Sequence, residues 1–329
     1  MNNQKFNKIY STQRKRVDNK FETLLKGKSP ASLYQPCEYI IIGGGKRLRS
    51  FLVMLSAFAV GGKMDSVFNA SLSVELLHNF TLVHDDIMDN SDKRRGQPTL
   101  HKKYDVSTAI LAGDSLIALA YKYLLKDCHD NNIKRVVEIF TNGVIEVCEG
   151  QSYDKEFETK TNVNIKDYLL MIKKKTAILL QTCCEIGAVL GNGDEKEIKA
   201  LSNYGLNLGM AFQLQDDYLD IFGDESEFGK SVGSDLVEGK KTFLFLKAIE
   251  KAKGKDLGSI KYILKNNGIE RNQIPEYKNL YLKLNVNKEI EKEISKYTKR
   301  ALGALKILHD DKSKNILIWL ANQLLNRKS

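Results

Sequence analysis

The residues of this chain with the clearest chemistry begin with three aspartates followed closely by two arginines. The stretch DDIMDNSDKRR contains Asp85, Asp86 and Asp89, with Arg94 and Arg95 a few positions later. On a helix, residues four apart lie on one face, about 6 Å apart along the axis, so Asp85 and Asp89 could hold cations between them. Carboxylate oxygens favour Mg²⁺, and arginines favour anions such as phosphates. The pattern therefore suits a phosphorylated ligand, although an acidic turn followed by a basic loop at the surface has the same composition.

A second cluster with the same spacing favours the chemical interpretation. The stretch FQLQDDYLD contains Gln213, Asp216, Asp217 and Asp220, and its aspartates repeat the positions i, i+1 and i+4 of the first cluster. Two independent copies of this spacing are unlikely by chance. If both stretches are helical, each presents an acidic face, and the two faces could share one group of metal ions.

These motifs, together with several others, resemble those of the trans-isoprenyl diphosphate synthases, the polyprenyl synthetase family. The matching segments are DDIMD followed by RRG, FQLQDDYLD, GGGKRLR, a Lys-Thr pair and GKSVGSDLVEGKKT, and they run from about Gly43 to Thr242. The resemblance implies a prenyltransferase that condenses isopentenyl diphosphate with an allylic diphosphate. It implies Mg²⁺, three ions in all, and catalytic roles for all six aspartates. The expected metal ligands are Asp85, Asp89 and Asp216.

The segment IIIGGGKRLR is a candidate seat for one of the two diphosphates. Three glycines, Gly43 to Gly45, precede basic residues at the start of a predicted helix, where backbone amides and basic side chains can bind phosphate oxygens. By resemblance, Lys46 and Arg49 bind isopentenyl diphosphate. Serine at position 50 replaces the proline usual in the family. His78 and Arg95 are assigned to the same substrate, although a single helical histidine is often only a core residue.

The second diphosphate, that of the allylic substrate, is assigned to another set of residues. Lys175 and Thr176 match the family's Lys-Thr step, and Lys175 is also expected to take part in catalysis. Lys173 and Lys174 beside them are expected to be solvated. By resemblance Arg94 contacts the same diphosphate. Three further residues are expected to bind substrate: Gln213, and Lys230 and Lys240 of a glycine-spaced lid.

Product length is expected to depend on two residues before the first cluster. Phe80 lies five positions before Asp85, as in archaeal-type geranylgeranyl diphosphate synthases, and Thr81 follows it. Helical projection places Phe80 on an apolar stripe and Thr81 on a polar stripe with His78 and the aspartates, and the polar stripe should line a cavity. The expected product is the C20 compound, with a farnesyl or a longer-chain product as the alternative.

The sequence predicts that helices position these residues. Only 4 prolines occur, and apolar residues recur at helical spacing. No composition break divides the chain, so we expect a single all-α domain over residues 1–329, a helical bundle around a central substrate cavity. Residues 266–287 look like a poorly matched insertion, and the chain beyond residue 246 is expected to be structural.

The composition of the chain indicates which partners and which cellular location to expect. With 42% hydrophobic residues, the sequence is expected to contain no apolar run of the roughly 20 residues that a membrane span needs, and the N-terminus lacks a signal-peptide core. These features predict a cytoplasmic protein without stable membrane insertion. The net charge of +10 is concentrated in lysines without a nucleic-acid motif, so no nucleic-acid partner is expected. An odd number of cysteines without a CxxC pair argues against disulfides or zinc and predicts small core residues; they are Cys37, Cys128, Cys148, Cys183 and Cys184.

Two other classes of protein stay open from the sequence. A class I terpene cyclase also has a DDxxD cluster, but it would not need the GGGKRLR seat or a second aspartate cluster. A non-catalytic synthase subunit would have lost acids from one cluster, whereas both clusters are intact. A homodimer is expected, and the apolar helix predicted over Leu111–Leu125 is assigned to the dimer contact or the pocket wall.

Overall fold

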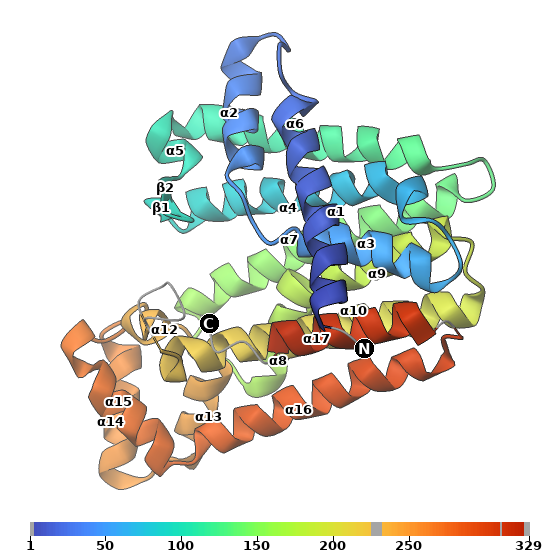
Figure 1. Ribbon diagram of the computed structural model, residues 1–329. Coiled ribbons are helices and arrows are strands. Elements are labelled where there is room, and N and C mark those ends of the chain that lie inside the picture. The colour runs from blue at the N-terminus through green and yellow to red at the C-terminus, as the bar shows by residue number, and fades with distance from the viewer. Residues whose placement is uncertain (1–2, 225–231, 310, 326–329) are drawn as a thin grey trace. The chain divides into compact units, whose positions relative to one another are not determined.

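The computed structural model describes residues 3–224, 232–309 and 311–325, and helices dominate it (Figure 1). Among these residues the only strands are β1 (Lys93–Arg94) and β2 (Gln97–Pro98), which pair antiparallel. The all-α prediction is confirmed. Contacts divide the chain into two compact units. Unit 1 comprises Met1–Val144, Thr182–Ser202 and Ile307–Trp319, and unit 2 comprises Ile145–Gln181, Asn203–Lys306 and Leu320–Ser329. The expectation of one domain over the whole chain stays a prediction.

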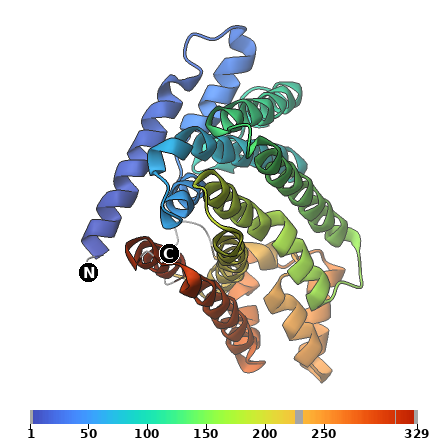
Figure 2. The ribbon, with the colours of Figure 1, turned by 90° about the vertical axis from the view of Figure 1, so that its right-hand side faces the viewer.

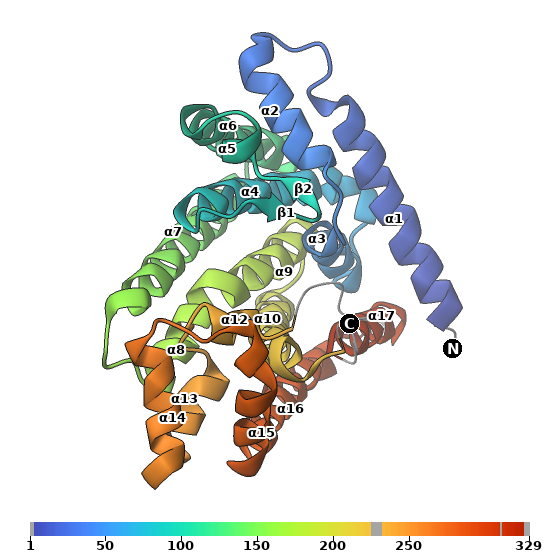
Figure 3. The ribbon, with the colours of Figure 1, turned by 90° about the vertical axis from the view of Figure 1, so that its left-hand side faces the viewer.

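Unit 1 contains the first aspartate cluster and the glycine-rich segment. Its helices, with the short hairpin between α4 and α5, are α1 (Asn3–Leu24), α2 (Ala31–Ile42), α3 (Leu48–Ala59), α4 (Phe68–Met88), α5 (Leu100–Lys103) and α6 (Val106–Leu124). Helices α4 and α6 lie side by side, and the hairpin follows the C-terminal end of α4 (Figure 3). Three further helices have residues in both units: α7 (Ile133–Thr159), α9 (Ile178–Leu190) and α10 (Glu195–Phe222). Helix α7 can be followed as one unbroken green helix in Figure 2.

Local sequence explains where the site-bearing helices begin. Asp127 accepts hydrogen bonds from the Ala70 amide and the Asn69 side chain, both at 2.8 Å, and so satisfies donors at the start of α4. Asp105 caps α6 by accepting from the Thr108 amide at 2.8 Å. Helix α4 is buried along most of its length, but its last turn, which carries the aspartates, is more exposed. The cap therefore fixes the helix at one end while the other end presents the acidic residues.

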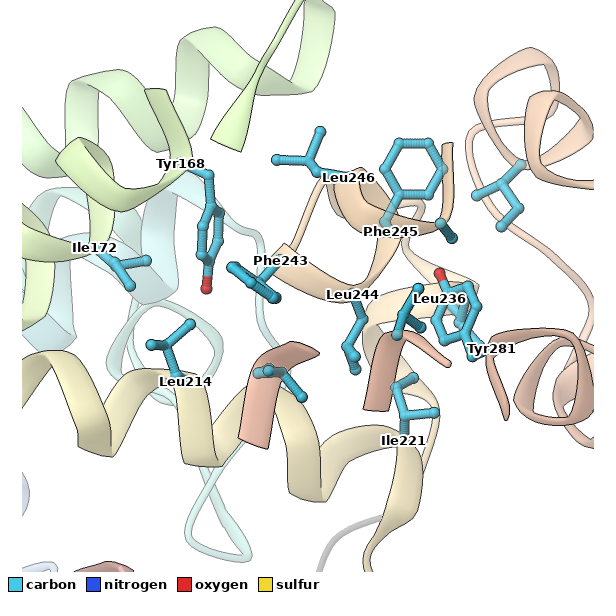
Figure 4. Close-up of a cluster of buried hydrophobic side chains, with 14 of the residues drawn as sticks. Tyr168, Ile172, Leu214, Ile221, Leu236, Phe243, Leu244, Phe245, Leu246 and Tyr281 are labelled. Carbon is cyan, nitrogen blue, oxygen red and sulfur yellow. The ribbon is translucent and has the colours of Figure 1, made fainter. Parts of the chain in front are cut away.

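Unit 2 contains the second aspartate cluster and an apolar core. Its remaining helices are α8 (Ile165–Ile172), α12 (Ser234–Val237), α13 (Phe243–Lys251), α14 (Gly254–Lys265), α15 (Ile274–Lys283) and α16 (Val286–Ala304). Four successive residues of α13, Phe243 to Leu246, are buried in a cluster with Tyr168, Leu214 and Tyr281 (Figure 4). The region after residue 246 thus contributes to a core, as expected of a structural segment. Helix α17 (Asp311–Leu325) has residues in both units.

Two expectations from composition need correction. The segment Val106–Asp127 is long and apolar enough to cross a membrane by length and composition, although no such run was expected. In the protein, 44% of that window is buried. Of the five cysteines, all without disulfides, Cys37, Cys183 and Cys184 are buried as predicted and Cys128 is half-buried. Cys148 is exposed, so it is not a core residue.

Candidate functional site

The three aspartates of the first cluster lie in different environments at the end of α4. Asp86 is buried, and both of its oxygens accept hydrogen bonds from Arg94 Nε at 2.9 Å, with Arg94 Nη2 2.7 Å from Oδ1. Such a bidentate pair is strong and orients both groups. Asp85 is half-buried and Asp89 is exposed. The buried aspartate therefore attaches the hairpin to the helix, and the other two, the predicted metal ligands of this cluster, lie on the more accessible side.

The glycine-rich segment and the hairpin are brought together, as the prediction of a shared diphosphate seat requires. Arg95 Nη1 donates a hydrogen bond to the carbonyl oxygen of Gly44. A Cβ at Gly45, whose φ is +143°, would lie 3.1 Å from the same guanidinium, so glycine permits this approach. Tyr39 at the end of α2 donates to the Pro98 carbonyl at 2.9 Å. The hairpin that carries Arg95 is thus joined both to the glycine-rich loop and to the end of α2.

Arg47 differs from its basic neighbours because its charge is neutralised within unit 1. Its guanidinium lies 2.8 Å from Asp18 and 3.6 Å from Glu75, and the residue is only 3% exposed. It also covers the ring of Phe21 at 4.8 Å. Its backbone is left-handed, with φ of 48°, at the residue before α3. Arg47 therefore fixes the start of α3, and the predicted binding roles stay with Lys46 and Arg49.

His78 lies in a strongly positive environment. Desolvation lowers its pKa well below the usual value, and four cations lower it further: Arg49, Arg95, Arg94 and Arg47. Desolvation also lowers the pKa values of Arg49 and Arg95. The Arg49 Nε is buried without a hydrogen-bond partner within the described residues. A neutral imidazole among like charges that repel one another is an environment that an anion would stabilise.

Phe80 and Thr81 follow on the same helix. Thr81 Oγ1 donates a hydrogen bond to the His78 carbonyl oxygen at 2.8 Å. The side chains of Phe80 and Thr81 are half-buried. The Phe80 ring contacts the ring of His84, with centroids 4.6 Å apart. The expected roles of Phe80 and Thr81 in product length stay predictions.

In unit 2, a chain of hydrogen bonds runs from the Lys-Thr step to the second aspartate cluster. Thr176 Oγ1 donates to Gln213 Oε1 at 2.9 Å, and Gln213 Nε2 donates to Asp217 Oδ1 at 3.1 Å. The other oxygen of Asp217 accepts from the Tyr168 hydroxyl, which points toward α10 in Figure 4. Asp217 is 4% exposed, and burial raises its pKa well above the usual value. Asp217 is thus an internal anchor, whereas Asp216 on the same turn is half-buried.

Lys175 and Thr176 lie in a single π-helical turn, η3 (Lys173–Ala177), where the Ile178 amide donates to the Lys173 carbonyl. Such turns often occur at functional sites. Lys175 pairs with Asp154 on α7, and Lys174 pairs with two other acids of that helix. A Cβ at Gly150 would lie 2.2 Å from the Lys175 amide nitrogen. Glycine at position 150 therefore lets α7 lie directly against the turn.

The part of the predicted lid that the structure describes lies beside Asp220. The Asp235 amide donates to Asp220 Oδ2 at 3.0 Å. Burial, and then the charge of Asp220, raises the pKa of Asp235 to about 7. Lys240 lies 2.7 Å from Glu238 and 3.7 Å from Asp235, and these charges raise its pKa although burial opposes them. The other lid lysine, Lys230, lies outside the described residues.

The donor set suits the expected metal. Asp85, Asp89 and Asp216 offer only carboxylate oxygens, which Mg²⁺ prefers, and none of them is fully buried. Among residues 3–224, 232–309 and 311–325, no group of three or more His, Cys, Asp or Glu side chains is arranged to hold a metal by itself. Oxygens of a bound diphosphate commonly complete such sites. The number of ions, three, stays a prediction.

Sequence reasoning missed several residues of these networks. Tyr168 lies in an apolar helix, and a buried tyrosine there looks like any core aromatic. Asp154 and Glu75 are single acids without a repeated spacing. Only Tyr168 had a signal in the sequence. It lies seven residues, about two helical turns, before Lys175, so the two residues could be expected on the same helical face.

Comparisons of the sequence with known proteins find one family and several relatives of similar length. The sequence model of the family described as polyprenyl synthetase matches residues 30–281. A geranylgeranyl pyrophosphate synthase of Geoglobus acetivorans is 39% identical over 320 residues, covering 97% of this chain and 98% of that protein. A geranylfarnesyl diphosphate synthase of Natronomonas pharaonis is 40% identical over 240 residues, covering 67% and 70%.

A solved structure gives the same result for the fold. The crystal structure of a geranylgeranyl pyrophosphate synthetase from Pyrococcus horikoshii is 36% identical, with a TM-score of 0.90, and covers 98% of this chain and 100% of that one. The similarity therefore extends over the full length of both chains.

Proposed function

Because this chain belongs to the polyprenyl synthetase family, we propose that it condenses isopentenyl diphosphate with an allylic diphosphate to form the C20 product geranylgeranyl diphosphate. Family membership confirms the predicted enzyme class, a trans-prenyltransferase, and the isoprenoid synthase type of fold. The observation that carries the proposal is the combination of two intact aspartate clusters with a separate arginine-rich anion seat. A terpene cyclase, which has one diphosphate substrate, would not need that seat.

The anion seat of unit 1 suits isopentenyl diphosphate. Arg49 and Arg95 supply positive charge, and neutral His78 can donate one hydrogen bond without adding to the repulsion. Lys46 is exposed in the loop that precedes α3. A bound diphosphate would lower the mutual repulsion of the arginines, which gives this substrate a physical reason to bind there.

The residues of unit 2 suit the allylic diphosphate. Lys175 and Thr176 are presented by the π turn, and Gln213 is held by Thr176 and Asp217. Lys240 adds charge from the lid, and the family resemblance assigns Arg94 to the allylic diphosphate as well. As the C–O bond of the allylic substrate breaks, negative charge grows on the leaving diphosphate. Fixed cations therefore stabilise the transition state more than the ground state.

Asp85, Asp89 and Asp216 would hold Mg²⁺, which would supply further positive charge to the diphosphate when bound. The allylic carbocation left by ionisation is attacked by the double bond of isopentenyl diphosphate. A proton is then lost to the departing diphosphate, which completes one C5 addition. This sequence of steps needs no covalent nucleophile, which agrees with a sequence that shows no Ser/His/Asp or Cys/His signature.

We propose a homodimer in the cytoplasm, without stable membrane insertion and without a nucleic-acid partner. The support for the dimer is a group of exposed apolar side chains in the first turns of α6: Leu111 is 60% exposed, Val106 49% and Ile110 42%. A second copy of the chain is a partner that would cover such a surface.

The test is incubation with Mg²⁺, isopentenyl diphosphate and a C5, C10 or C15 allylic diphosphate, followed by chain-length analysis. A C20 product from all three primers supports the proposal. A shorter or longer main product would support the alternative of a farnesyl or longer-chain synthase. Cyclised hydrocarbon, or no consumption of isopentenyl diphosphate, would contradict the proposed reaction.

A further inference from the structure

Phe80, the residue expected to stop the growing prenyl tail, contacts a second aromatic ring on the same helix. His84 lies four residues later, so the two side chains share one face of α4. Their ring centroids are 4.6 Å apart and the ring planes are inclined at 57°. Both side chains are half-buried. The position of the Phe80 ring is thus determined by its neighbour as well as by its own rotamer.

His84 is in turn confined by helix α6. A Cβ at Gly113 would lie 2.3 Å from His84 Nε2 and 2.6 Å from Cδ2, so the imidazole lies directly against the backbone of α6 at this glycine. The adjacent Asp114 Oδ1 lies 3.8 Å from Nε2, beyond hydrogen-bond range. The imidazole therefore cannot move toward α6 without moving the helix backbone.

We propose that His84 is a specificity-determining residue that positions Phe80 and so helps to set product length. This inference rests on the proposed function. His84 directly precedes Asp85. Phe80 lies five residues before Asp85, about 7.5 Å from it along the helix axis. In the proposed function, the diphosphate of the growing product lies near Asp85 and its tail near Phe80, so one short segment of α4 contacts both ends. Packing against Gly113 holds His84, and His84 holds the Phe80 ring across the path of the tail.

The test compares His84→Ala with His84→Asn by chain-length analysis of the products. His84→Ala leaves a cavity beside Phe80 into which its ring can tilt, so the products should lengthen by one or more C5 units. His84→Asn keeps a planar side chain against Phe80 without extending further toward Gly113, and should retain more of the C20 product than His84→Ala. A control is His129→Ala: this histidine lies in the turn before α7, and its loss should leave product length unchanged.

Product length separates this role from a merely structural one, because a loss of stability lowers the rate without changing where elongation stops. Circular dichroism establishes that each variant is folded. If folded His84→Ala forms the same products as the unmodified enzyme, the proposed role of His84 is wrong while the prenyltransferase assignment stands. If the unmodified enzyme forms no prenyl diphosphate, the proposed function itself fails.

Discussion

At the scale of single residues, the structure distinguishes charged groups that look alike in the sequence. Arg47 and Arg49 are two positions apart, yet Arg47 pairs with Asp18 and Glu75 while the Arg49 Nε has no partner among the described residues. Asp85 and Asp86 are adjacent, but only Asp86 is buried against Arg94. Since a charge neutralised within the fold is less available to a ligand, these contacts identify the residues that can bind one.

The two adjacent aspartates should therefore respond differently to substitution. Asp85→Ala should lower turnover by about 100- to 1000-fold with little change in stability, because it removes an electrostatic contributor at an accessible position. Asp86→Ala should lower the free energy of unfolding by about 1–3 kcal/mol, since it breaks the pair with Arg94. Steady-state kinetics and urea unfolding measure both. An Asp85→Ala enzyme with normal turnover would contradict its assignment as a metal ligand.

His78 should make stability depend on pH. Its pKa in the folded protein lies well below the usual value, so at pH above about 6.5 it is neutral in both the folded and unfolded states. Below about pH 6.5 the unfolded state binds a proton that the folded state does not, and stability should fall by up to about 1.4 kcal/mol per pH unit. Urea unfolding at pH 7.5 and 5.5 should show a smaller loss for His78→Gln than for the unmodified chain. Equal losses would show that His78 does not contribute.

At the scale of helices, glycines determine how closely the site-bearing elements approach. Gly150 lets α7 contact the π turn, and a Cβ at Gly209 on α10 would lie 2.5 Å from Ala177 Cα. The turn that carries Lys175 and Thr176 is thus packed between two helices. Its position therefore depends on these backbone contacts as well as on the side-chain pairs of Lys174, Lys175 and Thr176.

Gly150→Ala should displace the turn. The new methyl group would overlap the Lys175 backbone, so the KM for the allylic substrate should rise and the free energy of unfolding should fall by about 1–3 kcal/mol. A matched control is Gly258→Ala in α14, where a Cβ would meet no atom within 4 Å. That change should stabilise the protein by about 0.4–1 kcal/mol and leave both KM values unchanged. Equal effects of the two substitutions would contradict this account of the turn.

The Tyr168 hydroxyl should matter for the second aspartate cluster. Tyr168→Phe leaves buried Asp217 with one donor fewer, so stability should fall by about 1–3 kcal/mol and turnover should fall with it. Tyr277→Phe is the control, because this tyrosine of the same core donates to the Ser259 carbonyl, away from the aspartates. Comparing kcat and unfolding for the two variants tests the role. A normal kcat in Tyr168→Phe would exclude it.

At the scale of the whole molecule, the sequence was sufficient for the fold class but not for the partners of individual side chains. The helical spacing of apolar residues and the scarcity of proline predicted an all-α chain, and repeated aspartate spacing identified the two clusters. The Tyr168–Asp217 bond and the Arg47 pairs were not predictable. They join residues far apart in the chain, and nothing in the types or spacing of such residues records which of them meet. The boundaries of the two contact-defined units also have no signal in the sequence, since α7, α9 and α10 each contribute to both.

The apolar surface of α6 leads to a prediction about assembly. Leu111→Glu places a charge at the most exposed apolar position of this helix, where a second copy could bury it only at a high cost. The variant should be monomeric by light scattering at concentrations where the unmodified protein is a dimer. Lys122→Glu, a change of charge on the same helix at a position already polar, is the control. A Leu111→Glu variant that stays dimeric would place the dimer contact elsewhere.

The π turn between α8 and α9 also has a consequence for insertions and deletions in this chain. A π turn contains one residue more than the α-helical turn that it replaces. Removing any one of Lys173, Lys174 or Lys175 would leave two lysines before Thr176 and almost the same composition. It would nevertheless allow the segment to rewind as a regular helical turn. The helical residues on either side would keep nearly the same rotation relative to each other, because the π turn and the α turn each complete about one turn of the helix. The widened backbone around Lys175 and Thr176 would be lost, so at this position the count of residues, more than their identity, maintains the turn that carries these two side chains.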